Sequence, residues 1–493
     1  MNNSGSRQKD GEVLSKARLF LENFLFYGFG GIISKVIPLI MLPIITRLMP
    51  DPLFYGLNDL SGTITSFASA IAVLGMYDAM FRYFFEKDDV EYQRDICSTT
   101  LLFTLGMSLL VFVLMLILRE PIAAYIFNDP QYAYLVYLTA MATLIGATNS
   151  IISAPTRMQN KRKIFLITNT VSPIIGYSIS VPMLLAGYYV IALPLAGVVC
   201  SLIMEGVFYV LNRSWFQLRR FRLDYLRQLL VIAVPLAPTF LVYWVFGSAD
   251  RIMIAQMIGV DGTGLYAIGS KLGMASQLIY TAFAGGWQYF AFSTMHEENQ
   301  VQSNTRVFEY LGIISFSGGM FICALAHPIY ELLFVGEYVA GYIVSPYLFL
   351  APLLLMLYQV AGNQFLVIKK TWPGIIILSA GAVANILLNL LLIPILGIEG
   401  AGIATLLGYA VSVVLVSIVL QRMQLMAIPL RFIGACAITA GEIILWRLCW
   451  VTSPLPSMAA WLIATAGILL LYRSDITQLV RKTASSLARK NNK

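Results

Sequence analysis

The sequence predicts an all-α polytopic membrane protein of about fourteen transmembrane helices, arranged as two pseudo-twofold-related six-helix lobes followed by two extra C-terminal helices. Three observations support this prediction: the composition, a succession of long apolar runs, and an internal repeat. Of the 493 residues, 58% are hydrophobic and 12% are charged, and this charged fraction is about half that of a soluble domain. The composition excludes a soluble enzyme, a disordered chain and a nucleic-acid-binding protein.

Apolar runs long enough to cross a membrane recur along the whole chain. A span needs about 20 mostly apolar residues, and the connections between the runs are short. The first run begins near Leu19 and lacks a cleavage pattern, so we expect a retained span and not a signal peptide. The expected spans are 22–46, 57–81, 96–118, 132–155, 164–186, 189–211, 229–258, 264–292, 307–326, 343–366, 374–396, 398–420, 431–451 and 455–472.

The distribution of basic residues agrees with these spans. With the N-terminus in the cytoplasm, 27 of the 33 Lys and Arg residues fall in segments on the cytoplasmic side, as the positive-inside rule requires. Arg47 and Arg119 fall at outer ends, and the remaining four lie within spans. We therefore expect both termini to be cytoplasmic, and we attribute the net charge of +8 to topology and not to a nucleic-acid partner.

The two halves of the chain resemble each other at a separation of about 210 residues. The matching segments are RLMPDPLFYGLNDL (47–60) with MIGVDGTGLYAIGSKL (257–272), and EPIAAYIF (120–127) with HPIYELLF (327–334). Each repeat holds an even number of spans, so the two lobes share one orientation. This arrangement predicts transport by two bundles that rock about a shared cleft; a duplication that only fills the membrane is the alternative.

The spans and the repeat together divide the chain into six segments. We expect a cytoplasmic N-terminal segment (1–21), a first lobe of spans 1–6 (22–211), a basic cytoplasmic linker (212–228), a second lobe of spans 7–12 (229–420), the extra spans 13 and 14 (431–472), and a basic cytoplasmic tail (473–493).

Basic residues within spans indicate a candidate substrate site, because a charge at a span centre costs about 2.5–3.5 kcal/mol unless it faces the protein interior or a wet cavity. These candidates are Arg251, Lys271 and Lys35. Asp250 directly precedes Arg251, and adjacent helical residues point about 100° apart, so we expect each to have its partner elsewhere, with Lys271 a candidate neighbour of Asp250. The alternative is a neutral network of structural ion pairs.

Three acids within spans are candidates for a cavity role or for ion coupling: Asp250, Glu205 and Asp78. Glu205 is a lone acid on an apolar helix, which is consistent with a proton or coupling-ion site and also with a hydrogen-bonded structural role. Asp78 precedes Arg82 by four residues, the favourable order for a helical ion pair, so we expect a structural pair there.

Motifs of nucleotide hydrolysis, zinc proteolysis and serine hydrolysis are absent from the sequence. The two histidines, His296 and His327, are too far apart in the chain to suggest a metal site. We therefore expect no enzymatic activity, no catalytic residues, no cofactor and no metal.

Three segments resemble bacterial polysaccharide-exporting flippases, a branch of the multidrug/oligosaccharidyl-lipid/polysaccharide exporter superfamily. They are GFGGIISKVIPLIMLPIITRLM (28–49), GSADRIMIAQMIGVDGTGLYAIGSKLG (247–273) and ANILLNLLLIPILGIEGAGIAT (384–405). The second contains the pairing of an acid with a basic residue, followed by G-x-Y-x-x-x-x-K, that is typical of the second half of these proteins. The resemblance covers residues 20–425 and is strongest in the second half.

The resemblance implies two lobes around a central cavity in the bacterial plasma membrane. It also implies a polyprenyl-pyrophosphate-linked oligosaccharide that moves from the inner to the outer leaflet, with its anionic headgroup held by Arg251, Lys271 and Lys35. Partners would be the bilayer, this substrate and possible polysaccharide polymerase or assembly proteins. The alternatives are a lipid II-type flippase, a cation-coupled multidrug exporter of the same superfamily, and a membrane glycosyltransferase or polymerase.

Overall fold

The computed structural model describes residues 36–273 and 300–478 apart from residues 371 and 476, together with a few positions between 275 and 287. All the elements within these residues are helices, without a strand among them. Eleven of the helical segments are long and apolar enough to cross a membrane, or twelve if one bent pair counts as a single span. The prediction of an all-α polytopic membrane protein is confirmed.

The total of about fourteen spans stays a prediction. Two of the expected spans, 22–46 and 264–292, lie in part outside the described residues. Within the described part of the first, a shorter apolar helix covers Val36–Leu48.

The described chain forms two compact units. The first contains the described residues up to Ile268, with Phe334–Tyr338 and Asn385–Ala401, and the second contains Gly269–Leu333, Val339–Ala384 and the residues from Gly402 onward. Contacts define these units, whereas the repeat defines the two expected lobes. The lobe boundaries therefore stay a prediction.

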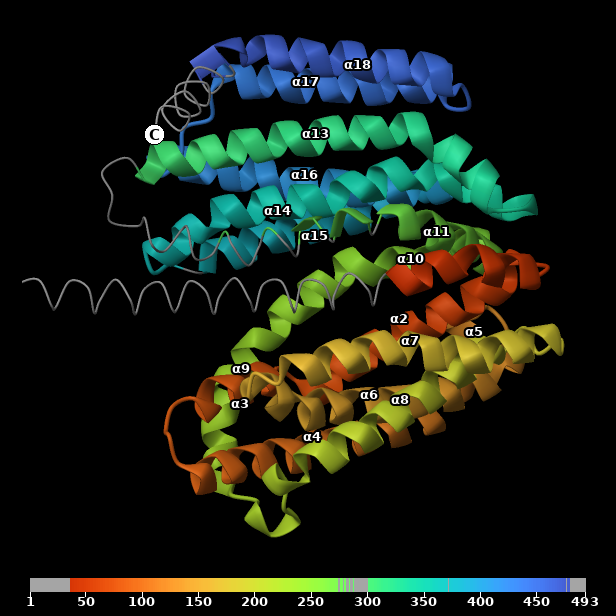
Figure 1. Ribbon diagram of the computed structural model, residues 1–493, viewed down its shortest axis with the longest axis vertical. Helices are drawn as coiled ribbons and strands as arrows, with labels where there is room; N and C mark the ends of the chain where they lie inside the picture. The colour runs from red at the N-terminus through yellow and green to blue at the C-terminus, as the bar shows by residue number, and fades with distance from the viewer. Residues whose placement is uncertain are drawn as a thin grey trace, which may run out of the picture. The chain divides into compact units, whose positions relative to one another are not determined.

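Within the first unit, α6 packs along both α4 and α8, and α9 packs against α2, α3 and α4 (Figure 1). The helices that belong wholly to this unit are α2 (Pro52–Val73), α3 (Met76–Phe84), α4 (Val90–Ile117), α5 (Arg119–Ile126), α6 (Ala133–Met158), α7 (Arg162–Leu185), α8 (Ala192–Asn212), α9 (Leu223–Trp244) and α10 (Asp250–Ile258). Helix α11 (Val260–Gly273) begins in the first unit and ends in the second.

In the second unit, α13 packs against α14, α17 and α18, and α17 lies beside α18 (Figure 1). The indole Nε1 of Trp461 on α18 donates a hydrogen bond to the carbonyl oxygen of Ser317 on α13 at 3.0 Å. The helices are α13 (Gln300–Leu333), α14 (Ser345–Val367), α15 (Trp372–Leu396), α16 (Ile398–Arg422), α17 (Leu430–Leu445) and α18 (Pro454–Leu471). Residues 385–396 of α15 and 398–401 of α16 belong to the first unit.

The span expected over 57–81 is broken into α2 and α3, which meet at an angle of 46°. Leu74 and Gly75 between them both adopt positive φ values, 47° and 74°. A Cβ atom on Gly75 would lie 2.6 Å from the carbonyl oxygen of Ala233 on α9. Glycine therefore allows both the left-handed backbone and the close approach of α9 at this point.

The two segments matched by the repeat have the same local structure. In 47–60 a helix ends, a short break follows, and α2 begins at Pro52 with the side chain of Asp51 accepting a hydrogen bond from the backbone N–H of Leu53 at 2.7 Å. In 257–272, α10 ends at Ile258, Gly259 takes a φ of 112°, and α11 follows. Each segment thus contains a break between two helices, and the duplication itself stays a prediction.

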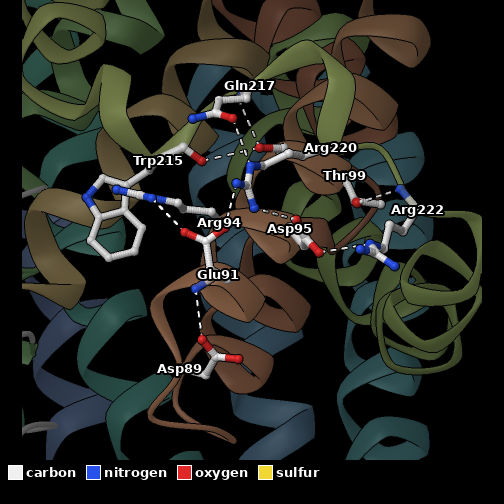
Figure 2. A network of polar contacts seen from close by, with 10 residues as sticks. Asp89, Glu91, Arg94, Asp95, Thr99, Trp215, Gln217, Arg220 and Arg222 are labelled. Atoms are coloured by element: carbon white, nitrogen blue, oxygen red, sulfur yellow. Dashed lines mark hydrogen bonds and ion pairs between the residues drawn. The ribbon is translucent and has the colours of Figure 1, made fainter.

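The basic linker between α8 and α9 is tied to the start of α4 by ion pairs (Figure 2). Asp95 Oδ1 lies 3.2 Å from Arg220 Nη1, and Asp95 Oδ2 lies 2.8 Å from Arg222 Nε. Arg220 also contacts Glu91 at 2.5 Å, and its hydrogen bond to Glu91 raises the pKa of the guanidinium above its ordinary value. The side chain of Thr99 accepts a hydrogen bond from the backbone N–H of Arg222. The linker is therefore held against a transmembrane helix.

Candidate functional site

Two buried charges of the first unit, Asp250 and Arg251, lie where α9 meets α10. The two helices are continuous through a π-helical turn, Val245–Ala249, and Asp250 and Arg251 begin α10. Arg251 Nη1 donates a hydrogen bond to the carbonyl oxygen of Gly247 within this turn. Single π-helical turns are frequent at functional sites because they reorient the side chains that follow.

The guanidinium of Arg251 is held by two carboxylates. Its Nε lies 2.6 Å from Asp59 Oδ2 on α2, and its Nη1 lies 3.4 Å from Asp250 Oδ1. The three side chains are almost fully buried, with 9% of Arg251, 13% of Asp59 and 3% of Asp250 exposed. Arg251 thus bridges α10 and α2.

The carboxylate of Asp250 has partners at both oxygens. Its Oδ1 accepts a hydrogen bond from the backbone N–H of Arg251 at 2.9 Å, and its Oδ2 accepts one from the hydroxyl of Tyr266 on α11. The Arg251 guanidinium also lies 5.7 Å from the centre of the Tyr266 ring. We refer to Asp59, Asp250, Arg251 and Tyr266 as the Arg251 cluster.

The Arg251 cluster corrects one expectation and supplies a residue that sequence reasoning missed. Asp250 and Arg251 each have a partner elsewhere, as expected, in Tyr266 and Asp59. The interpretation that the two do not face each other was wrong, because the long Arg251 side chain also reaches back to its neighbour. Asp59 was not among the candidates, although it lies inside the span expected over 57–81. An acidic residue within an expected span was the signal that could have identified Asp59 from the sequence. With two carboxylates beside one guanidinium, the positive charge of Arg251 is already balanced.

Among the other predicted residues, those that the structure describes lie on α3, α8 and α11. Lys271 is half-buried near the C-terminal end of α11 and belongs to the second unit. Lys35 lies outside the described residues. Glu205 on α8 is half-buried and accepts a hydrogen bond from the Thr148 hydroxyl on α6 at 2.5 Å. Glu205 therefore has the hydrogen-bonded environment that was one of its two interpretations.

Asp78 is exposed on α3. The expected pair with Arg82 is not formed in this described helix, because Arg82 Nη1 lies 3.6 Å from Glu86 Oε2 instead. Asp78 thus remains without the structural role that its spacing suggested.

Another buried acid, Glu442, lies on α17 in the second unit. Its side chain is buried, and neither carboxylate oxygen has a hydrogen-bond partner among the described residues. The indole Nε1 of Trp446, four residues later, is also without a partner there. Buried polar groups are usually satisfied, so this pair of groups requires an explanation.

An apolar groove of about 570 Å³ runs through the second unit between α17 and the helices α13, α14 and α16. Aliphatic side chains such as Leu350, Leu354, Leu407 and Ile444 line it. Arg447 is the charged residue among its described lining, and it lies in the π-helical turn Trp446–Trp450 that follows α17. The groove thus has the chemistry of a site for a hydrocarbon chain.

A comparison with known protein families shows which family the chain belongs to. The family described as "Polysaccharide biosynthesis protein" matches residues 44–340. The chain belongs to this family. The match includes the helices α2 to α10 and the Arg251 cluster, and it confirms the resemblance to polysaccharide flippases seen in the sequence. A comparison with curated protein sequences finds no match.

Solved structures of membrane transporters share the fold. The lipid II flippase MurJ in an inward closed conformation has a TM-score of 0.70 and 13% identity, with 92% of this chain and 99% of that chain covered. An inward-facing multidrug resistance MATE family transporter of the MOP superfamily has a TM-score of 0.57 and 15% identity, with coverages of 80% and 98%. A MOP superfamily transporter from Pyrococcus furiosus has a TM-score of 0.55 and 13% identity, with coverages of 82% and 95%.

These likenesses show that this family member has the transporter fold of the MOP superfamily. The chain, a member of the polysaccharide biosynthesis protein family, is a multi-pass membrane protein. The solved structures that share its fold are transporters or flippases.

Proposed function

We propose that the protein flips a polyprenyl-pyrophosphate-linked oligosaccharide, the repeat unit of a polysaccharide, from the inner to the outer leaflet of the bacterial plasma membrane by alternating access. The observation that carries the proposal is the match of a polysaccharide-biosynthesis family to a chain with a transporter fold. The proposal includes cytoplasmic termini, which the distribution of basic residues favours.

The substrate combines two chemistries that need different surroundings. A pyrophosphate and its sugars cannot enter hydrocarbon without a large desolvation cost, so the headgroup needs a polar path through the protein. An isoprenoid tail needs an apolar surface. The groove lined by α13, α14, α16 and α17 supports the proposal because it offers such a surface within the second unit.

We assign binding of the anionic substrate headgroup to Arg251, Lys271 and Lys35. Arg251 would bind the headgroup in exchange for one of its present hydrogen-bond partners. Arg suits phosphate because its planar fork presents several N–H donors. In the structure Nε and Nη1 are committed to Asp59, Asp250 and Gly247. A headgroup phosphate that binds the guanidinium through two nitrogens must therefore compete with one of these partners. Replacement of Asp59 would couple substrate binding to a rearrangement of α2 against α10.

The acids have separate assignments in the proposal. Glu205, which is half-buried between α6 and α8, is the candidate site for a coupling proton or cation. Asp250 positions Arg251, whereas the exposed Asp78 has the weaker claim to a coupling role. Assembly proteins such as a polysaccharide polymerase are the expected partners, because a flipped repeat unit must be polymerised on the far side of the membrane.

The experiment that tests the proposal is translocation of a lipid-linked oligosaccharide in proteoliposomes, together with complementation of a strain that lacks its polysaccharide flippase. We expect the wild-type protein to restore surface polymer and Lys271→Gln to reduce it. Arg119→Gln is the matched control, because Arg119 begins α5, outside the Arg251 cluster, and pairs with Glu120. Restoration at wild-type levels by both Lys271→Gln and Arg251→Gln would contradict the headgroup assignment.

A lipid II-type flippase is the second candidate, favoured by the superposition on the lipid II flippase MurJ. The same proteoliposomes loaded with lipid II in place of the oligosaccharide lipid separate the two. Transport of a cationic dye without any dependence on either lipid would support a multidrug exporter and contradict the proposal.

A further inference from the structure

A polar pocket of about 390 Å³ lies in the first unit between α6, α7 and α8, outside the Arg251 cluster. Its volume is within the range of about 300–1,000 Å³ that is typical of small-molecule sites. Each of the three helices turns one face to it, with residues three, four or seven positions apart. Helix α6 contributes Asn149, Ser153, Thr156 and Arg157.

The pocket is lined with hydrogen-bond acceptors. The hydroxyls of Ser153 and Thr168 donate to carbonyl oxygens of their own helices, which leaves their lone pairs to face the pocket. Asn169 Nδ2 also donates within its helix, to Phe165 O at 2.9 Å, so its Oδ1 remains as an acceptor. The Oδ1 of Asn149 is buried without a partner among the described residues. Such a wall is complementary to a ligand with several hydroxyl donors.

Arg157 supplies a positive charge at one end of the pocket. Its Nη1 donates to the Tyr77 hydroxyl at 3.1 Å, and its guanidinium lies 5.0 Å from the centre of the Phe165 ring. No carboxylate of the described chain forms an ion pair with it, and none lines the pocket. Since a guanidinium carries five N–H donors, most of them remain for an anion.

The pocket is long enough for a headgroup with two different ends. Arg157 is exposed, whereas Asn149 lies eight residues earlier on the same helix, about 12 Å along its axis. Phe165 and Phe208 add aromatic surface to the wall. A hydroxylated ring can therefore face the amides and hydroxyls while its anionic group contacts Arg157.

We propose that this pocket, formed by α6, α7 and α8, binds an anionic sugar, with Arg157 on the negative group and Asn149 and Asn169 on the ring hydroxyls. The assignment deepens the proposed function and rests on it for the natural ligand, because a lipid-linked oligosaccharide contains both hydroxylated rings and negative charge. The negative group is either a sugar phosphate next to the lipid carrier or the carboxylate of an acidic sugar.

Equilibrium binding to the full-length protein in phosphatidylcholine nanodiscs tests the site without any translocation. The probes are glucose 1-phosphate and glucuronic acid, with neutral glucose and inorganic phosphate as comparisons, observed by calorimetry and by saturation-transfer NMR. We expect saturable binding of at least one sugar anion and binding at least roughly fivefold weaker for glucose and for inorganic phosphate. The preferred anion identifies the source of the charge.

Variants separate the two halves of the pocket. We expect Arg157→Gln to weaken sugar-anion binding by about tenfold and to leave glucose binding unchanged, with Arg157→Lys retaining part of the affinity. Asn149→Leu should weaken binding of the sugar anion and of glucose but not of inorganic phosphate. Arg119→Gln carries the same change of charge outside the pocket and should bind as the wild type does.

Two results would overturn the assignment: no saturable binding of either sugar anion to the wild type, or equal affinity in Arg157→Gln. Absence of binding in a protein that still translocates its lipid would refute the pocket and leave the proposed function intact. Binding that depends on Arg157, in a protein without translocation, would support the pocket and refute flipping.

Discussion

Asp59→Asn is the substitution that tests the Arg251 cluster most directly. It removes the negative charge that lies 2.6 Å from Arg251 Nε and leaves a guanidinium of which 9% is exposed. Two charges about 4 Å apart attract each other by roughly 4 kcal/mol at an effective dielectric constant of 20. Removal of one partner of a buried pair costs about 3–5 kcal/mol in known cases. Because Asp250 remains 3.4 Å from the guanidinium, we expect a loss of stability below that range but above that of an exposed pair.

Thermal unfolding of the purified protein in detergent measures this loss. Glu86→Gln is the matched control, because the Arg82–Glu86 pair is longer, at 3.6 Å, and its side chains are 64% and 42% exposed. An exposed pair contributes about 0–1 kcal/mol, so the control should unfold close to the wild type. If Asp59→Asn is no less stable than the control, the reasoning that Arg251 depends on a buried carboxylate is refuted.

A triple variant separates stability from transport. Asp59→Leu combined with Arg251→Met and Asp250→Asn removes all three buried charges of the Arg251 cluster, which should recover most of the lost stability. If translocation of the lipid-linked oligosaccharide remains lost after stability is recovered, Arg251 acts on the substrate. If translocation also returns, the pair is structural and the headgroup assignment of Arg251 is refuted.

Three further predictions concern other parts of the chain. Gly75→Ala should lower stability by at least about 1–2 kcal/mol in thermal unfolding, because its φ is 74° and the new Cβ would press on Ala233 O; wild-type stability would contradict this. Asp95→Asn should increase the rate of trypsin cleavage after Arg220, since the linker loses an anchor; an unchanged rate would show that Asp95 does not hold it. Glu442→Met should raise stability by about 1–3 kcal/mol in thermal unfolding, because an unsatisfied buried carboxyl is removed; a loss of stability would indicate an unseen partner.

The Arg251 cluster shows where prediction from the sequence stops. A charge inside an apolar run is visible in the sequence, so Asp250 and Arg251 were found. Their partners were not, since Asp59 is separated from Arg251 by 192 residues. The pocket near Arg157 was missed for the same reason, because its hydroxyls and amides lie on three helices and are unremarkable one at a time.

The sequence by itself determined the class of this protein, an all-α polytopic membrane protein, and most of the membrane-crossing helices that the structure describes. Lipid requires every span to be apolar and internally hydrogen-bonded, so local composition is sufficient to predict a helix such as α4 or α16. Tertiary structure decided which charges are neutralised, where the span around Gly75 breaks, and which helix faces form the groove and the pocket. These features depend on distances between helices far apart in the chain, which no local pattern specifies.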